Sequence, residues 1–327
     1  MKNLIYYPYF EVEDQEWLKF ALLYLPKIEA IVPYEGQNEI SELSRKIEGE
    51  TGFINFKEPE YETGIAASIK AVNVIERIIK RPALYSEIFC TPNIYTKWQE
   101  PTNQRSTLYR GKYSSGFSEF CQEHALSREV ANGISVSRSL AFLYMTLLAN
   151  SIAEKEGKGV ITDNTEYHRI PIIIDAPASN ASTAFDFAKT VFSLKLPENL
   201  SNIPIDRVIA LRKKPDYVAN LSAFHDQLDK FLLSIESGAD PEAFLRSLNI
   251  TIKDVSDEVL KLGVGFSIIG LSAWALFKEP TLLTYLKDVA GPALSFSIDS
   301  LINVRGTKKN IEKKLQARNL LASLTIA

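Results

Sequence analysis

The sequence predicts a mixed α/β protein, in which a small N-terminal parallel α/β unit over residues 1–60 is followed by a larger, mostly helical domain over residues 61–327. In the first sixty residues, short apolar runs alternate with helical patterns, as in strand–helix–strand units. After them, most apolar residues recur at helical spacing. The chain of 327 residues also exceeds one typical core of about 150, so two packed units are expected.

The N-terminal elements follow from apolar runs and the residues that interrupt them. Three runs predict strands, at residues 4–10, 28–32 and 53–56. A buried helix is expected over residues 13–25, because acidic side chains open it and Pro26 stops it. A second helix is expected from Asn38 to Glu48. Strands separated by helices indicate parallel pairing.

Helical patterns dominate the rest of the chain. Helices are predicted at residues 65–79, 134–156, 216–238 and from 240 onward, and a short buried strand at 172–174. The first of these helices carries an apolar face formed by Ile65, Ile69, Val72, Ile75 and Ile79. Residues 81–115 contain three prolines and a polar run, which predict a short helix and a long loop. Gly157 is expected to end the helix at 134–156.

Composition and charge narrow the functional class. The chain is 46% hydrophobic with a net charge of −3, so nucleic-acid binding is not expected outside the basic segment 305–318. The two cysteines, Cys90 and Cys121, lie in no metal-spaced motif, and the first residues do not form a signal peptide. A cytoplasmic location is therefore expected. Cys121 and His124 could form a thiol–imidazole pair, but packing is favoured.

Three sequence blocks resemble a known family. They are Leu4–Phe10 with Trp17–Tyr24 and Ile31–Pro33, Tyr144–Ala153 with Thr162–Asp163, and Leu196–Asn199 with Ile205–Arg212. Together they resemble an uncharacterised bacterial family known only as a domain of unknown function, over residues 1–240. The resemblance implies a setting in mobile or antiphage regions, and it brings no catalytic residues with it.

The best cluster of chemistry-bearing side chains is Asp163, Glu166 and His168. Carboxylate and imidazole groups suit a divalent metal or acid–base catalysis. However, the spacing of Asp163 and His168 fits neither one helix face nor an alternating strand, and Asp-Asn-Thr runs are common in turns and caps. A turn or cap is therefore favoured over a catalytic site.

The carboxyl ends of the first strands are a second candidate site, because open α/β sheets bind ligands there. Tyr7, Tyr9, Tyr34 and Glu35 are expected at this edge. Of these, Tyr7, Tyr34 and Glu35 are the candidate ligand-binding residues, although ordinary packing at the rim of the sheet is the favoured interpretation.

An apolar, glycine-containing segment at residues 262–302 is the most unusual part of the chain. Residues 262–277 carry no charge, but about 20 apolar residues are needed to span a membrane. A buried helical hairpin followed by a basic last helix is favoured over a membrane segment. The candidate membrane or partner contacts are Phe266, Ile269, Trp274, Phe277, Lys308, Lys309, Lys313 and Lys314.

These patterns favour a cytoplasmic interaction or regulatory protein without a cofactor, which acts through a protein partner or self-association. Bacterial antiphage defence is the context that the resemblance implies. The alternative is a membrane-acting effector in which residues 262–318 meet the bilayer. A metal-dependent hydrolase or nuclease that uses Asp163, Glu166 and His168 is the remote alternative, and a non-enzymatic role is favoured.

Overall fold

The structure is a computed structural model that describes residues 3–101, 105–164, 194–197, 200–236, 242–263 and 267–269. Contacts divide the chain into two compact units. We call residues 2–12 with 27–179 the sheet unit, and residues 13–26 with 180–327 the helical unit. The chain therefore passes back and forth between the units, and the predicted boundary at residue 60 falls inside the sheet unit.

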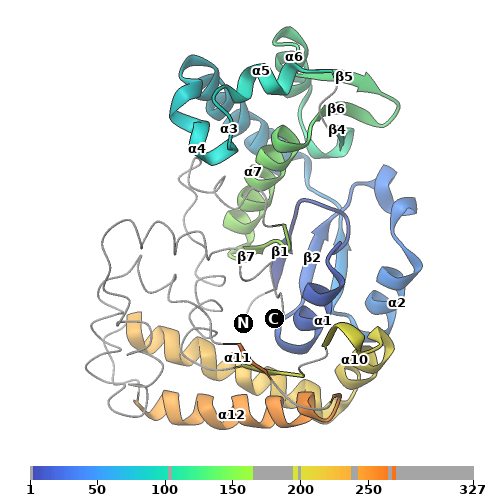
Figure 1. Ribbon diagram of the computed structural model, residues 1–327, viewed down its shortest axis with the longest axis vertical. Coiled ribbons are helices and arrows are strands. Elements are labelled where there is room, and N and C mark those ends of the chain that lie inside the picture. The colour runs from blue at the N-terminus through green and yellow to red at the C-terminus, as the bar shows by residue number, and fades with distance from the viewer. Residues whose placement is uncertain are drawn as a thin grey trace. The chain divides into compact units, whose positions relative to one another are not determined.

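A four-stranded parallel sheet organises the sheet unit (Figure 1). Its strands are β1 (Leu4–Tyr6), β2 (Ile28–Ile31), β3 (Ile54–Lys57) and β7 (Gly159–Ile161). They lie in the order β3-β2-β1-β7, and Leu4 of β1 is opposite both Ile28 and Gly159. The predicted parallel sheet with helices is confirmed. β7 lies outside the predicted unit of residues 1–60. The sequence does not predict this strand, because a run of three residues is too short to show a period.

Two helices connect β2 to β3: η1 (Tyr34–Glu39) and α2 (Glu42–Thr51). Ser41 caps α2 by accepting a hydrogen bond from the Ser44 N–H at 3.2 Å, and Gly52 ends it in the left-handed conformation, with φ 57°. The helices between β3 and β7 are α3 (Tyr61–Lys80), η2 (Pro82–Tyr85), α4 (Ser86–Phe89), α5 (Ile94–Gln99), η3 (Arg110–Lys112), α6 (Ser115–Glu123) and α7 (Arg138–Glu156).

A second, antiparallel sheet lies within the same stretch. It consists of β4 (Arg105–Tyr109), β5 (Ser127–Val130) and β6 (Gly133–Ser137), in the order β4-β6-β5. The predicted loop at 81–115 is therefore wrong at β4, and the predicted helix at 134–156 is wrong in its first residues. Ile134 and Val136 are buried with Ser135 between them, which is the alternation of a strand. β6 runs directly into α7, so a single apolar stretch of the sequence contains both a strand and a helix.

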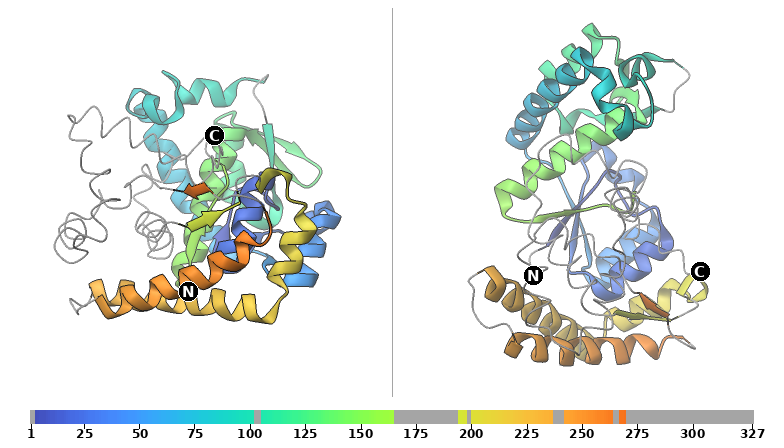
Figure 2. Two further views of the ribbon diagram at one scale, coloured as in Figure 1. Left: turned by 60° about the horizontal axis from the view of Figure 1, so that its bottom comes forward. Right: turned by 60° about the vertical axis from the view of Figure 1, so that its left-hand side comes forward.

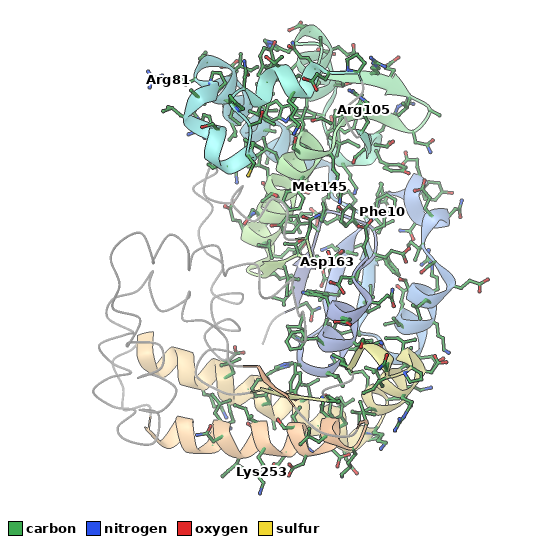
Figure 3. All side chains as sticks on the ribbon, in the orientation of Figure 1. Phe10, Arg81, Arg105, Met145, Asp163 and Lys253 are labelled. Carbon is green, nitrogen blue, oxygen red and sulfur yellow. The ribbon has the colours of Figure 1, made fainter. Side chains whose placement is uncertain are left out.

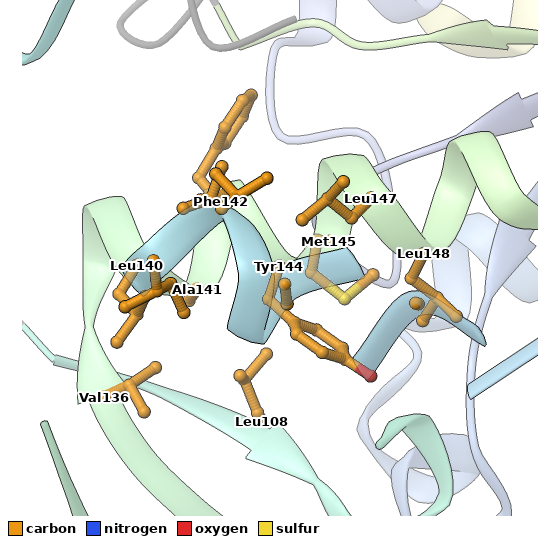
Figure 4. Packing of buried hydrophobic residues seen from close by; sticks show 14 of the residues in the cluster. Leu108, Val136, Leu140, Ala141, Phe142, Tyr144, Met145, Leu147 and Leu148 are labelled. Atoms are coloured by element: carbon orange, nitrogen blue, oxygen red, sulfur yellow. The ribbon is translucent and has the colours of Figure 1, made fainter. Parts of the chain in front are cut away.

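α7 is enclosed on every side. Each of its residues from Ser139 to Ala153 is buried, and Gly157 ends it with φ 61°. Figure 4 shows its side chains packed with those of Leu108 and Val136 from the antiparallel sheet. On the parallel sheet, the ring of Tyr7 lies 5.6 Å from that of Phe142. The predicted core helix and its glycine cap are confirmed.

α3 buries small side chains together with part of its predicted apolar face. Its buried residues include Gly64, Ala67, Ser68 and Ala71 as well as Ile75 of that face. The prediction is wrong for Ile69, whose side chain is 60% exposed. The Tyr144 hydroxyl of α7 lies 3.1 Å from the Ser68 Oγ and donates to the Lys112 carbonyl at 2.7 Å. Close helix approach favours small residues at the contact, which turns the larger isoleucine away.

The C-terminal end of α7 joins the parallel sheet through two lysines and two glutamates. Lys158 contacts Glu156 at 2.5 Å and donates to Glu29, which is 5% exposed, at 2.6 and 2.7 Å. Lys57 pairs with Glu156 as well. Burial would raise the pKa of Glu156, but hydrogen bonds from Lys158 and Lys57 outweigh it and hold that pKa below its usual value.

The helical unit contains α1 (Gln15–Tyr24) and elements between residues 194 and 269. The latter are β8 (Leu194–Leu196), η4 (Leu200–Asn202), α10 (Ile205–Arg212), α11 (Pro215–Glu236), α12 (Glu242–Leu260) and β9 (Ser267–Ile269). α11 and α12 lie side by side (Figure 2), and β8 pairs with β9 in antiparallel fashion. The helix predicted at the start of 262–302 is therefore wrong at β9, where two isoleucines stand between Ser267 and Gly270 and favour a strand.

Four successive carbonyls at the end of α1 accept hydrogen bonds from buried side chains of α10 and α11. Arg212 donates to Leu22 and Leu25 at 2.8 and 3.1 Å, Tyr217 donates to Leu23, and the His225 Nε2 lies 2.9 Å from the Tyr24 oxygen. The last four carbonyls of a helix have no partner within that helix, and leaving them buried and unpaired is costly. α1 is therefore completed by residues far along the chain.

Replacing Arg212 should destabilise the helical unit. Arg212→Met removes a buried guanidinium that holds two carbonyls, and we expect the free energy of unfolding to fall by about 3 kcal/mol. Urea unfolding followed by circular dichroism, with hydrogen exchange of α10 and α11 peptides, measures the loss. Arg207→Met, on the exposed face of the same helix, is the matched control. Equal losses in the two variants would contradict the capping role.

Acidification should weaken the same unit through His225. Burial lowers the pKa of His225 from its usual 6.5 to about 4, and the Arg212 charge acts in the same direction. The unfolded chain therefore takes up a proton first as the pH falls. Stability is unaffected above pH 6.5 and decreases between pH 6.5 and 4, by about 3 kcal/mol in total.

His225→Gln tests this prediction because glutamine can still donate to the Tyr24 carbonyl but does not titrate. The difference in unfolding free energy between the wild type and this variant should change with pH between 6.5 and 4. A constant difference across that range would show that His225 does not sense pH.

Candidate functional site

The carboxyl ends of β1 and β7 define the candidate site. From β1 the chain moves outward to β2 and β3 on one side, and later returns to place β7 on the other side. The order of strands therefore reverses at β1. The crevice outside the carboxyl ends at such a switch point is the place where open parallel sheets bind ligands.

Five polar side chains meet at this point, and we call them the switch-point cluster. They are Tyr6, Tyr9, Arg138, Asp163 and Asn164. They come from β1, the segment after it, the first residue of α7 and the segment after β7. Figure 3 shows Asp163 beside β1. Segments that are distant in sequence are thus joined at one edge of the sheet.

The phenol oxygen of Tyr9 is the centre of the cluster. It accepts one hydrogen bond from Arg138 Nη2 at 2.7 Å and another from Asn164 Nδ2 at 2.9 Å. Arg138 is half-buried and begins α7, so its guanidinium lies at the positive end of a 19-residue helix. This side of the cluster is therefore rich in N–H donors and positive in potential.

Asp163 forms the acidic side of the cluster. It is 7% exposed and accepts a hydrogen bond from the Tyr6 hydroxyl at 2.7 Å. The backbone turns around it, because the Thr162 Oγ1 accepts from the Asn164 N–H at 3.1 Å. This is the local turn chemistry of threonine. The turn sets Asp163 and Asn164 in place, and Tyr6 of β1 and Tyr9 after it bind the two side chains.

The structure places the candidate acids only in part. Asp163 lies in the switch-point cluster, whereas Glu166 and His168 lie outside the described residues. Within the part of the chain that the structure describes, no three histidine, cysteine, aspartate or glutamate side chains gather as a group that could hold a metal ion.

Of the tyrosines and the glutamate expected at the carboxyl edge, the structure brings only Tyr9 into the cluster. Tyr7 is 3% exposed and belongs to the hydrophobic core. Tyr34 is 77% exposed and Glu35 is exposed beside it on η1. Sequence reasoning missed Arg138, because the helix was predicted to start at residue 134 and this arginine then fell inside it. A separate strand at 133–137 would have indicated its position.

A second group of side chains, here called the Lys112 site, lies where the segments after β1 and β2 meet the end of β4. The Tyr109 hydroxyl donates to Glu39, and the Phe10 and Tyr109 rings are 5.1 Å apart. The Lys112 Nζ lies 4.5 Å from the centre of the Phe10 ring. Gly36 completes the contact, since a Cβ there would stand 2.4 Å from the Phe10 ring. A side chain at position 36 would therefore displace the Phe10 ring.

Burial dominates the electrostatics of the Lys112 site. Lys112 is 3% exposed. Its burial lowers the pKa of the ammonium to about 7, although the Glu39 charge acts in the opposite direction. Burial also raises the pKa of Tyr109, with a further contribution from its hydrogen bond to Glu39. At neutral pH, Tyr109 is therefore a neutral donor, and Lys112 is divided between its charged and neutral forms.

The other thiol and imidazole candidates have packing environments. Cys121 is fully buried, and burial raises its pKa to about 12. His124 stacks on Phe120 at 4.5 Å between ring centres. The thiol is therefore protonated at neutral pH and is a poor nucleophile. This geometry supports the packing interpretation.

The candidate membrane or partner contacts can be followed only at Ile269, which pairs with Leu194 between β9 and β8. The others lie outside the described residues: Phe266, Trp274, Phe277, Lys308, Lys309, Lys313 and Lys314. Among the helices that the structure describes, none combines the length and apolar character needed to cross a bilayer.

Comparison of the chain with protein-family models, with curated proteins and with solved structures found no match.

Removing the Tyr6 hydroxyl should destabilise the sheet unit. Tyr6→Phe keeps the buried ring but takes a 2.7 Å donor from the buried Asp163 carboxylate. We expect a loss of about 1–3 kcal/mol in the free energy of unfolding, measured by urea denaturation. Tyr34→Phe, at a side chain 77% exposed, is the control and should change stability by less than about 0.5 kcal/mol. An unchanged Tyr6→Phe protein would show that Asp163 does not depend on this bond.

Proposed function

We propose that this chain is a regulatory binding protein whose state is set by a small molecule held at the switch-point cluster. The observation that carries the proposal is the Tyr9 oxygen, on which the donors of Arg138 and Asn164 converge at 2.7 and 2.9 Å. Open parallel sheets bind ligands at this point, and here oriented polar groups stand at it.

The chemistry of the donors favours a ligand that carries a carboxylate or phosphate group. A guanidinium recognises both groups in its plane, and an amide N–H adds a second donor. The first turn of α7 contributes the positive end of its dipole beside them. Asp163 stands on the opposite side of the cluster and is suited to accept hydrogen bonds from hydroxyl or amino groups of the same ligand.

A regulatory role follows from the position of the donor Arg138 on the central helix of the sheet unit. Arg138 is part of α7, which is buried from Ser139 to Ala153 and packs on both sheets. A ligand that draws Arg138 and Asn164 away from Tyr9 therefore acts on the central helix of the unit. Such a ligand shifts the protein between two states only by its difference in affinity for them. We further propose that the protein acts in antiphage defence. The change of state would be passed on through a protein partner or through self-association.

Binding can be tested with inorganic phosphate as a minimal oxyanion and citrate as a carboxylate. The melting temperature of the full chain is compared with that in sodium chloride of equal ionic strength. At ten to twenty times the dissociation constant, one of the two anions should stabilise the wild type by about 1–2 kcal/mol. Arg138→Gln should lose this gain.

Arg128→Gln is the matched control, because Arg128 is an exposed arginine of the same unit on β5. If Arg138→Gln responds to the anions as strongly as the control, the anion does not bind at the cluster. Hydrogen exchange of α7 reports on regulation. If the anion binds but exchange changes nowhere beyond the cluster, the regulatory part of the proposal is overturned.

A further inference from the structure

Among the described residues, Lys112 differs from Lys19, which is also buried, and from Lys158, which is partly buried. Lys19 donates to the carbonyls of Leu200 and Ser201 at 3.1 and 2.7 Å, and Lys158 is paired with Glu29 and Glu156. Among the residues that the structure describes, no carboxylate lies within 4.0 Å of the Lys112 Nζ and no group accepts a hydrogen bond from it. Its amine meets the face of Phe10 instead.

This environment changes the chemical character of the amine. Surface lysines are almost wholly protonated at neutral pH and have no free lone pair. Burial of Lys112 opposes its charged form and brings its pKa to about 7. A large fraction of the Lys112 amine is therefore neutral under these conditions. Desolvation of a lysine in an apolar setting is one of the recognised ways to make it nucleophilic.

The residues around Lys112 supply the remaining requirements of a reactive amine. Its backbone is fixed, because the Lys112 carbonyl accepts from the Tyr144 hydroxyl at 2.7 Å. The hydrogen-bonded pair of Tyr109 and Glu39 lies beside it, and Glu39 is exposed, so this carboxylate can exchange protons with water. The Phe10 face lies against the lysine nitrogen and stabilises the iminium cation that forms there.

We propose that the Lys112 Nζ is a nucleophile that forms an imine with a small aldehyde or ketone at the carboxyl edge of the parallel sheet. The nitrogen lone pair attacks the carbonyl carbon, and the carbonyl π electrons move to oxygen. A proton passes from nitrogen to that oxygen, which gives a carbinolamine. A proton from water protonates its hydroxyl group, and water leaves as the nitrogen lone pair forms the C=N bond. The resulting iminium then returns one proton to water and becomes the imine. Amine and carbonyl compound thus become imine and water, without an oxidant or reductant.

This inference goes beyond the proposed function and does not depend on it. It uses Phe10, Glu39, Tyr109 and Lys112, none of which belongs to the switch-point cluster. An Arg138→Gln protein that no longer binds phosphate should still react at Lys112. A Lys112→Met protein should still be stabilised by the anion. The two proposals can therefore fail separately.

The test is reductive trapping on the full chain at pH 7. The protein is treated with substoichiometric pyridoxal, or separately with formaldehyde, together with cyanoborohydride, and the labelled peptides are quantified by mass spectrometry. We expect Lys112 to be labelled roughly tenfold or more faster than Lys80, whose side chain is 72% exposed. The Lys112 rate should level off above about pH 7, whereas the Lys80 rate should continue to rise to pH 10.

Lys112→Met should abolish the fast label, and Lys80→Met is the matched control that keeps it. Formaldehyde is small enough to reach an amine that pyridoxal cannot reach. Labelling by formaldehyde alone would therefore show that the Lys112 amine is reactive but closed to the larger aldehyde. If neither aldehyde labels Lys112 faster than Lys80, the inference is overturned. It is also overturned if the Lys112 rate rises to pH 10 as the Lys80 rate does.

Discussion

The sheet unit depends on the complete burial of α7. A helix without a solvent-exposed face has to be covered all round, and here the parallel sheet, the antiparallel sheet and α3 each cover part of it. The requirement for close contact selects the small residues of α3, including Gly64 and Ser68. It also fixes where the ends of α7 lie. Glu156 meets two lysines beneath the sheet, and Arg138 reaches Tyr9 at the carboxyl edge. The position of the candidate site is thus a result of packing.

Local signals in the sequence identified much of this fold. Gly157 indicated the end of α7, because glycine readily adopts the left-handed conformation that often ends helices, and the apolar run of α7 indicated a buried helix. The signals failed where two elements share one apolar stretch, as at β6 and α7. They also failed where packing decides between two faces of one helix, as at Ile69 of α3. Neither choice is encoded in the order of residues alone.

Less of the candidate sites could be predicted. Tyr9 and Asp163 could be placed near a strand end, but their partners are 155 and 157 positions away. Arg212 bonds to backbone carbonyls, which every residue has, so no sequence pattern indicates its targets. The amine of Lys112 is unusual only because Phe10 and its neighbours enclose it. Burial of a lysine is a property of what surrounds it, and the sequence shows an ordinary charged residue.

The capping of α1 has a consequence for the protein during its synthesis. α1 leaves the ribosome well before Arg212 and His225, which complete it and follow 190 and 201 positions after their acceptors. At about 5–20 residues per second, that delay lasts roughly 10–40 s. Throughout this interval, the carbonyls at the end of α1 have only water as a partner and its apolar side chains lack their final cover. The nascent segment that contains α1 is therefore expected to bind chaperones until α11 has emerged.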